Sequence, residues 1–138
     1  MTTRVKRIKV LGIASAVLAG LAVSSAPAQA RNCEAPSGGL YDCDYGITLR
    51  GLGSTEYEEF VVGADKAVWT RHSAEGHWGG WTSLGGAATS EVFVEADGNS
   101  NEYRTTLIVL GTDGKPWAKV RPGMGQGWTD WARAPRPE

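Results

Sequence analysis

A repeat of about 50 residues is the feature of this sequence that most restricts its fold. Val62–Trp69 aligns with Leu110–Trp117 at an offset of 48 residues, and Trp78–Thr82 aligns with Trp128–Ala132 at an offset of 50. The two extra residues of the second copy fall in the loop 122–127. A period of about 40 to 50 residues with four strands per unit is typical of β-propeller blades.

The residues within and around the repeat favour strands over helices. Short β-branched and aromatic runs separated by glycine recur from residue 46 onward, without a 3.6-residue apolar period. The predicted strands are Gly46–Arg50, Glu56–Val62, Ala67–His72, Trp78–Leu84, Ser90–Ala96, Tyr103–Leu110, Pro116–Arg121 and Trp128–Arg133. The predicted fold is all-β, with two four-stranded blade-like antiparallel repeats in residues 46–138. Two blades cannot close a ring, so the repeats form either an incomplete propeller or a compact β-sandwich or barrel. We favour a compact monomer over a homo-oligomer.

Each repeat contains a turn of the type Gly-x-Asp followed by a strand that carries one tryptophan. Asp65 and Asp113 occupy the same place in the two turns, where a carboxylate oxygen accepts a hydrogen bond from the backbone N–H two residues on. We therefore predict a structural role for both carboxylates. The tryptophans that follow, Trp69 and Trp117, are predicted as core residues of their repeats.

Each repeat ends in a Trp-x-x-Trp motif, which consists of Trp78 and Trp81 in the first copy and Trp128 and Trp131 in the second. Side chains in a strand alternate with a period of two, so a spacing of three predicts that the rings of a pair point to opposite faces. One ring then enters the core, and the other stays near the surface, where tryptophan stacks well on the apolar face of a sugar. We predict these four side chains as ligand-binding residues. Burial against another protein is the alternative for an exposed ring.

With these motifs, the chain resembles the tryptophan-rich repeats of the bacterial fucose-binding β-propeller lectins of the Photorhabdus type. The resembling motifs, besides the tryptophans, are Gly63-Ala64-Asp65, Leu84-Gly85-Gly86 and Gly111-Thr112-Asp113-Gly114, and the resemblance covers about Phe60 to Ala134. It implies a non-enzymatic carbohydrate-binding protein with one shallow tryptophan-lined site per repeat. The chain departs from the family because the second copy ends in Arg133-Ala134-Pro135 instead of Leu-Gly-Gly. The family's rings also need about seven blades, whereas this chain has two repeats.

The N-terminus predicts export from the cell. Four basic residues precede the apolar run Val10–Val23, and Ala28-Gln29-Ala30 forms an Ala-x-Ala cleavage site, so residues 1–30 are predicted as a secretory signal peptide. A membrane anchor is the alternative, but this run of 14 residues is shorter than the roughly 20 that cross a bilayer. Removing the leader takes away four of the 14 Lys and Arg and none of the 15 Asp and Glu, so the formal charge changes from −1 to −5. That balance disfavours nucleic acid and anionic membranes as partners.

Both cysteines lie at the start of the exported chain. Oxidising conditions outside the cell favour a disulfide between Cys33 and Cys43, which would staple the segment 31–45. The stapled segment would present Leu40 and Tyr41 to a protein partner. The spacing differs from C-x-x-C, and two thiols without supporting histidines make a poor zinc site.

The sequence contains no recognisable catalytic machinery, cofactor motif or metal motif. His72 and His77 match no metal-ligand spacing, and Glu56, Glu58 and Glu59 are predicted as a solvated acidic strand face, not a glycosidase carboxylate pair. The leading hypothesis is a secreted lectin-like carbohydrate-binding module. The alternative is a secreted protein-binding adaptor or inhibitor, such as the linking subunit of a lectin-bearing toxin assembly. A secreted hydrolase is the least favoured.

Overall fold

The computed structural model of the chain describes residues 31–53, 55–95, 104–123 and 125–135. The predicted leader 1–30 lies outside them, as do the ends of two predicted strands at Ala96 and Tyr103. The described residues contain strands and no helix, which confirms the all-β prediction. The strands are β1 (Asn32–Glu34), β2 (Leu40–Asp42), β3 (Ile47–Gly51), β4 (Glu56–Val62), β5 (Val68–Ala74), β6 (His77–Trp78), β7 (Thr82–Gly85), β8 (Phe93–Glu95), β9 (Thr105–Leu110), β10 (Pro116–Arg121) and β11 (Ala132–Arg133).

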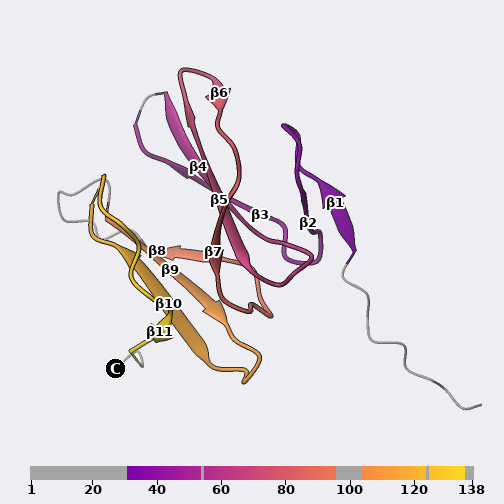
Figure 1. Cartoon of the computed structure of the whole chain (residues 1–138), viewed down its shortest axis with the longest axis vertical. Helices are drawn as coiled ribbons and strands as arrows, with labels where there is room; N and C mark the ends of the chain where they lie inside the picture. Colours follow the sequence, from indigo (N-terminus) through magenta and orange to yellow (C-terminus); the bar gives the residue numbers. More distant parts are fainter. Residues whose placement is uncertain (1–30, 54, 96–103, 124, 136–138) are drawn as a thin grey trace, which may run out of the picture.

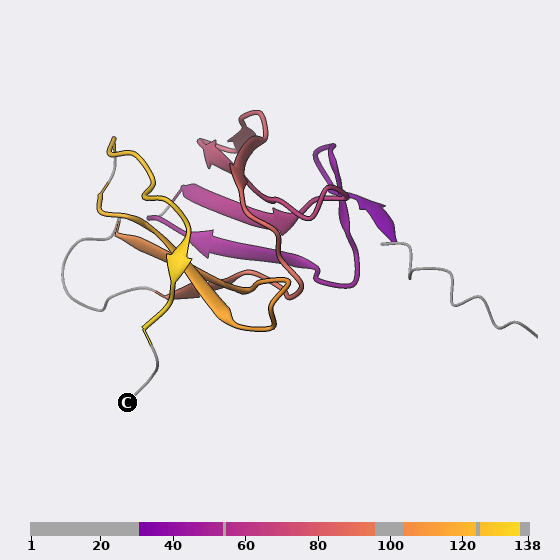
Figure 2. The ribbon, with the colours of Figure 1, turned by 60° about the horizontal axis from the view of Figure 1, so that its bottom comes forward.

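The strands form three antiparallel sheets that follow one another along the molecule (Figures 1 and 2). The N-terminal hairpin is β1–β2. The first unit has the order β3-β4-β5-β6, with β7 also pairing with β5, and the second unit has the order β11-β10-β9-β8. The first unit lies between the hairpin and the second unit, and the sheets are not closed into a barrel in the part that the structure describes.

The predicted strands agree with the structure to different degrees. Glu56–Val62 and Pro116–Arg121 have the predicted bounds. The prediction of one continuous strand over Trp78–Leu84 is wrong, because β6 pairs with the end of β5 and β7 with its beginning, and residues 79–81 leave the sheet between them. The predicted strand Trp128–Arg133 is reduced to its last two residues.

The N-terminal segment 31–45 forms a hairpin that the sequence analysis did not foresee as strands. Cys33 pairs with Tyr41 in the β1–β2 register, and the predicted disulfide between Cys33 and Cys43 is present, with a Cα–Cα distance of 5.3 Å. The covalent link closes the open end of the hairpin. This short sheet therefore depends on the disulfide, since two three-residue strands alone bury too little surface to be stable.

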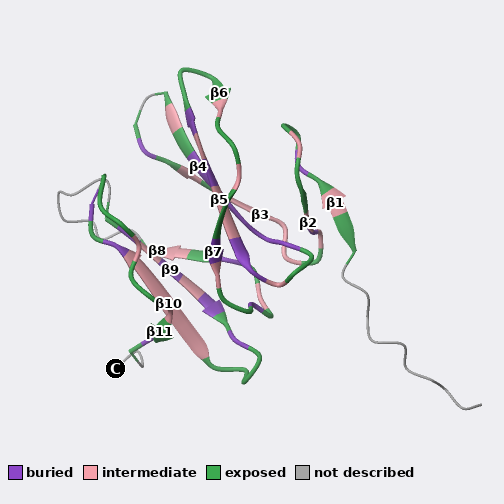
Figure 3. Cartoon of the chain, viewed as in Figure 1, coloured by how far each residue is buried: buried purple, intermediate pink, exposed green. Residues whose placement is uncertain are grey.

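The two units share one hydrophobic core, so they form a single structural body. The core cluster takes side chains from both units and from the segment that joins them: Phe60, Val62, Val68, Leu84, Ala88, Val92, Leu107 and Val109. Figure 3 shows the buried residues gathered on β4, β5 and β9. An edge-to-face contact between Phe60 and Trp128, with ring centres 6.2 Å apart, adds about 0.5–1.5 kcal/mol to the burial of these two side chains.

Two buried ion pairs lie on opposite faces of β4. Glu58 faces the second unit and binds both terminal nitrogens of Arg121, at 2.6 and 2.8 Å. Glu59 faces the other way and accepts from Arg71 at 2.7 Å. The two carboxylates are only 3% and 8% exposed, so the prediction of a solvated acidic face is wrong for them. Their guanidinium partners compensate for the cost of burying charge.

Candidate functional site

The Asp-Trp turn predicted from the repeat forms twice with nearly the same geometry. Asp65 Oδ1 accepts from the backbone N–H of Ala67 at 3.0 Å and from the indole N–H of Trp69 at 3.1 Å. Asp113 Oδ1 accepts from the backbone N–H two residues on at 3.0 Å and from the indole of Trp117 at 3.1 Å. Each carboxylate therefore tightens its turn, as predicted, and also fixes the orientation of an indole ring.

The fourth residue of this turn differs between the copies. Lys66 in the first unit has φ +68°, and Gly114 in the second has φ +69°. A lysine in this left-handed conformation is less stable than a glycine by about 1–2 kcal/mol. Lys66 compensates because its Nζ lies 2.8 Å from buried Asp42 and 5.4 Å from the ring centre of Tyr45, so it ties the N-terminal hairpin to the first unit. The hydrogen bond to Asp42 raises the pKa of Lys66 above its ordinary value.

The last tryptophan of each unit binds the segment that precedes the unit. The indole N–H of Trp131 donates to the carbonyl oxygen of Leu84 at 2.9 Å, and that of Trp81 donates to the carbonyl oxygen of Gly38 at 2.9 Å. The first acceptor belongs to the first unit and the second to the N-terminal hairpin. Consecutive parts of the chain are thus joined by the same indole-to-carbonyl hydrogen bond.

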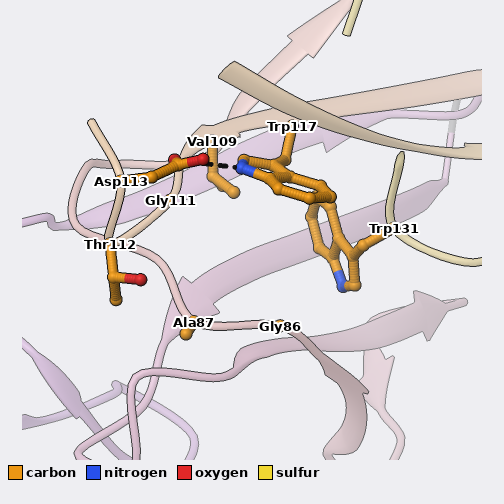
Figure 4. A pocket seen from close by; sticks show the side chains of 8 residues that line it. All are labelled: Gly86, Ala87, Val109, Gly111, Thr112, Asp113, Trp117 and Trp131. Carbon is orange, nitrogen blue, oxygen red and sulfur yellow. Dashed lines mark hydrogen bonds between the residues drawn. The ribbon is translucent and has the colours of Figure 1, made fainter. Parts of the chain in front are cut away.

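A pocket of about 280 Å³ opens at the junction of the two units (Figure 4). Its lining consists of Gly86, Ala87, Val109, Gly111, Thr112, Asp113, Trp117 and Trp131. In Figure 4 the two indole rings lie together on one side, and the Gly86-Ala87 segment of the first unit and Thr112 border the open space opposite them. Apolar rings, a hydroxyl and a carboxylate are therefore combined in one small concave surface, which is the composition expected of a small-molecule site.

Arg133 fixes one side of this pocket. Its Nη2 lies 3.0 Å from Asp113 Oδ2, and its guanidinium carbon lies 4.6 Å from the centre of the Trp117 ring. Asp113 also accepts from the backbone N–H of Lys115 and from the indole of Trp117. The Lys115 N–H first, then the indole and the guanidinium, hold the pKa of Asp113 below its ordinary value. The carboxylate is therefore ionised at neutral pH and holds Trp117 in a defined orientation.

The four tryptophans predicted to bind ligand do not share one site. Trp131 lines the pocket, whereas Trp78, Trp81 and Trp128 are not among its lining residues. Trp78 and Trp81 both contact the guanidinium of Arg71, at 4.7 and 4.4 Å from their ring centres. The prediction that the rings of this pair point to opposite faces is therefore wrong, because the residues between Trp78 and Trp81 have left the strand and its alternation.

The second Trp-x-x-Trp pair also turns both rings toward the preceding unit. Trp128 packs edge to face on Phe60, and Trp131 reaches Leu84, so each ring of the pair contacts the first unit. Arg121 lies 4.9 Å from the ring centre of Trp128. All six tryptophans of the chain are half-buried, and none is fully enclosed.

Trp117, which the sequence predicts as a repeat-core residue, is also a pocket residue. The side chain does pack against the core cluster, but it also lines the pocket. The missed lining also includes Thr112 and the Gly86-Ala87 segment. The Gly-Gly pair at the end of the first repeat is the sequence signal for this segment, because glycine has no Cβ and lets an aromatic ring lie close to the backbone.

The remaining predicted residues lie away from the pocket. In the N-terminal hairpin, Leu40 is 64% exposed and Tyr41 is half-buried. His72 Nε2 lies 3.6 Å from Glu56 Oε2, and His77 is exposed in β6. Among the residues that the structure describes, no group of three or more His, Cys, Asp or Glu side chains could hold a metal ion. No helix within the described ranges is long and apolar enough to cross a membrane.

The described residues form an all-β protein in which two tryptophan-rich antiparallel units form an aromatic pocket at their junction. No protein-family model matches the sequence, and a search of curated proteins also found no match.

Proposed function

We propose that this chain is an exported, non-enzymatic, lectin-like protein that binds carbohydrate in the pocket between the two units. The observation that carries the proposal is the pairing of Trp117 and Trp131 with the Thr112 hydroxyl and the Asp113 carboxylate in one concave surface. Indole rings offer flat apolar faces that match the C–H face of a sugar ring, and the polar groups offer partners for its hydroxyls. The family resemblance suggests a 6-deoxyhexose such as fucose.

The size of the pocket favours a single sugar residue. Its volume of about 280 Å³ lies just below the about 300–1,000 Å³ that is usual for small-molecule sites. A small, shallow pocket gives weak binding per site, so useful avidity would come from several sites or several copies acting together.

Export is supported by the disulfide as well as by the predicted leader. Disulfides such as that between Cys33 and Cys43 form and persist in oxidising compartments. A stapled N-terminal hairpin suits a protein that functions outside the cell.

Glycan-array binding of the full chain, expressed from its own leader and collected from the medium, tests the proposal. We expect Trp131→Ala and Trp117→Ala to lose the bound glycans. Trp78→Ala is the matched control, because Trp78 is equally half-buried but does not line the pocket, and it should keep the binding pattern. A blank array for the unmodified protein, or equal loss in all three variants that remain folded by circular dichroism, would contradict the proposal.

A groove between the two sheets supports a protein partner as the second candidate function. Strands β3 and β8 border a groove of about 490 Å³, where Leu49 is 58% exposed and Phe93 is 50% exposed. Both strands are at sheet edges, and an edge with apolar neighbours can accept a strand of another protein. In that case Leu49→Lys with Phe93→Lys would abolish co-purification of a stoichiometric partner from the medium and leave glycan binding unchanged.

A further inference from the structure

The N-terminal hairpin imitates the end of a repeat unit. Trp131 packs so closely on Gly86 that a Cβ there would lie 2.9 Å from the indole nitrogen, and Gly86 has φ +81°. Trp81 packs in the same way on Gly39, where a Cβ would lie 2.3 Å from the indole nitrogen and φ is +96°. In both places glycine is favoured for two reasons: the backbone has a positive φ, and a Cβ would meet the indole ring.

Two hydrogen bonds of the pocket frame are also duplicated at the junction of the hairpin and the first unit, whereas Ser83 stands opposite Trp69 where Arg133 stands opposite Trp117. The Asp113–Trp117 hydrogen bond of 3.1 Å has its counterpart in the Asp65–Trp69 bond of 3.1 Å. The bond of Trp131 to the preceding unit has its counterpart in the bond of Trp81 to Gly38, also at the same distance. Two indoles, one carboxylate and one close glycine thus recur together at both junctions.

We infer that the N-terminal hairpin completes a second carbohydrate site, framed by Trp69 and Trp81 and closed by Gly39 and Leu40. The inference rests on the proposed function of the pocket between the units. The hairpin takes the part that the Gly86-Ala87 segment takes in that pocket. One chain then carries two sites, although it contains only one junction between complete units.

Two further differences in the frame make the hairpin site less selective for hydroxyl groups. Ala64 stands at the place of Thr112, so the hydroxyl that Thr112 offers is missing. Leu40 follows Gly39 as Ala87 follows Gly86, and its exposed side chain offers more apolar surface than an alanine. We therefore expect this site to bind sugars more weakly and to discriminate less among them.

The Lys66–Asp42 ion pair holds the hairpin against the first unit, and the disulfide closes the hairpin itself. Lys66 stands where the second unit has Gly114, and its side chain reaches buried Asp42 at the end of β2. This clamp is specific to the first unit. It explains how a segment of only two short strands can keep the position of a complete unit.

The indole N–H signals of the six tryptophans in a ¹H–¹⁵N spectrum of the oxidised full chain provide the test. The signals are assigned with single Trp→Phe variants, and methyl glycosides of common hexoses and 6-deoxyhexoses are titrated. We expect the Trp117 and Trp131 signals to shift together, the Trp69 and Trp81 signals to shift together at higher sugar concentration, and Trp78 and Trp128 to shift least. Shifts of the first pair alone would overturn the inference and leave the proposed function standing. If no signal shifts, the proposed function fails, and the inference fails with it.

Two glycines with positive φ provide the matched variants. Gly39→Ala places a methyl group against Trp81, whereas Gly76→Ala, in the turn between β5 and β6, with φ +80° and nothing within 4 Å of the added Cβ, has comparable backbone strain without that contact. Gly39→Ala should lose the shifts of Trp69 and Trp81 and keep those of Trp117 and Trp131, and Gly76→Ala should keep both pairs. If Gly39→Ala does not fold, Leu40→Gln at the exposed neighbouring position should weaken the hairpin site alone. Unchanged shifts of Trp69 and Trp81 in both Gly39→Ala and Leu40→Gln would overturn the inference.

Discussion

Trp131 of the second unit donates its indole hydrogen to the carbonyl oxygen of Leu84 in the first unit, at 2.9 Å. The ring that makes this bond also lines the pocket, so the pocket depends on how the two units are docked. We call this contact of Trp131 with Leu84 the docking point. A change there should alter carbohydrate binding even where it leaves each sheet intact. Gly86, directly behind the ring, is the position where this can be tested.

Gly86→Ala should weaken both stability and carbohydrate binding, whereas Gly85→Ala should affect stability alone. Both glycines have positive φ, +81° and +69°, so either alanine costs about 1–2 kcal/mol of backbone strain. Only the alanine at Gly86 meets Trp131, and displacing the ring adds the loss of a hydrogen bond, about 0.5–1.5 kcal/mol. Urea denaturation and sugar titration of both variants check this. Equal binding by the two variants would contradict the role given to the docking point.

The sequence predicted those parts of the fold that depend on neighbouring residues. The bounds of β4 follow from its aromatic and β-branched residues, and the Asp65 turn follows from a hydrogen bond that spans two residues. The break after Trp78 could not be predicted in this way. It occurs where Trp81 turns to reach Gly38, which lies 43 residues earlier in the chain.

The pocket and the buried charges were missed for the same physical reason. Glu58 has the polarity of a surface residue, and its burial depends on Arg121, which lies 63 residues away. Trp117 is predicted as a core residue and packs half-buried against the core cluster, but the open space beside it exists only because another unit packs there. The burial of Glu58 and the pocket beside Trp117 both depend on contacts between distant segments. Such contacts leave no mark on the local hydrophobic periodicity of the sequence.

Removing one partner of the buried pair should be the most destabilising single polar change in the core. Glu58→Gln leaves Arg121 buried without its bidentate carboxylate, and breaking such a pair costs about 3–5 kcal/mol. The matched control is Asp44→Asn, since the Arg31–Asp44 pair is exposed on both sides and should contribute about 0–1 kcal/mol. Urea unfolding followed by tryptophan fluorescence measures both changes. Similar small decreases in unfolding free energy in the two variants would show that the Glu58–Arg121 pair does not stabilise the core as its burial indicates.

The ion pair of Lys66 should make stability sensitive to alkaline pH. Because the pKa of Lys66 is raised in the folded state, its contribution is complete below the ordinary value of 10.5 and is lost as the pH rises through the raised value. The difference in unfolding free energy between the natural chain and Lys66→Gly should therefore shrink above about pH 10.5. Comparing the two proteins removes the effect of tyrosines, which titrate in the same range. A constant difference from pH 8 to pH 12 would contradict the clamp between the hairpin and the first unit.

Asp113 should make the pocket sensitive to acid. Its pKa is lowered in the folded state, so its stabilising contribution is complete above the ordinary value of 3.8 and is lost as the pH falls through the lowered value. Protonation weakens the hydrogen bond to the Trp117 indole and the ion pair with Arg133, so the Trp117 N–H signal should move in this acidic range. The Trp81 signal is the internal control, because its acceptor is the carbonyl of Gly38, which does not titrate. In Asp113→Asn the Trp117 signal should no longer respond to acid. The same response in that variant as in the natural chain would show that another group orients the ring.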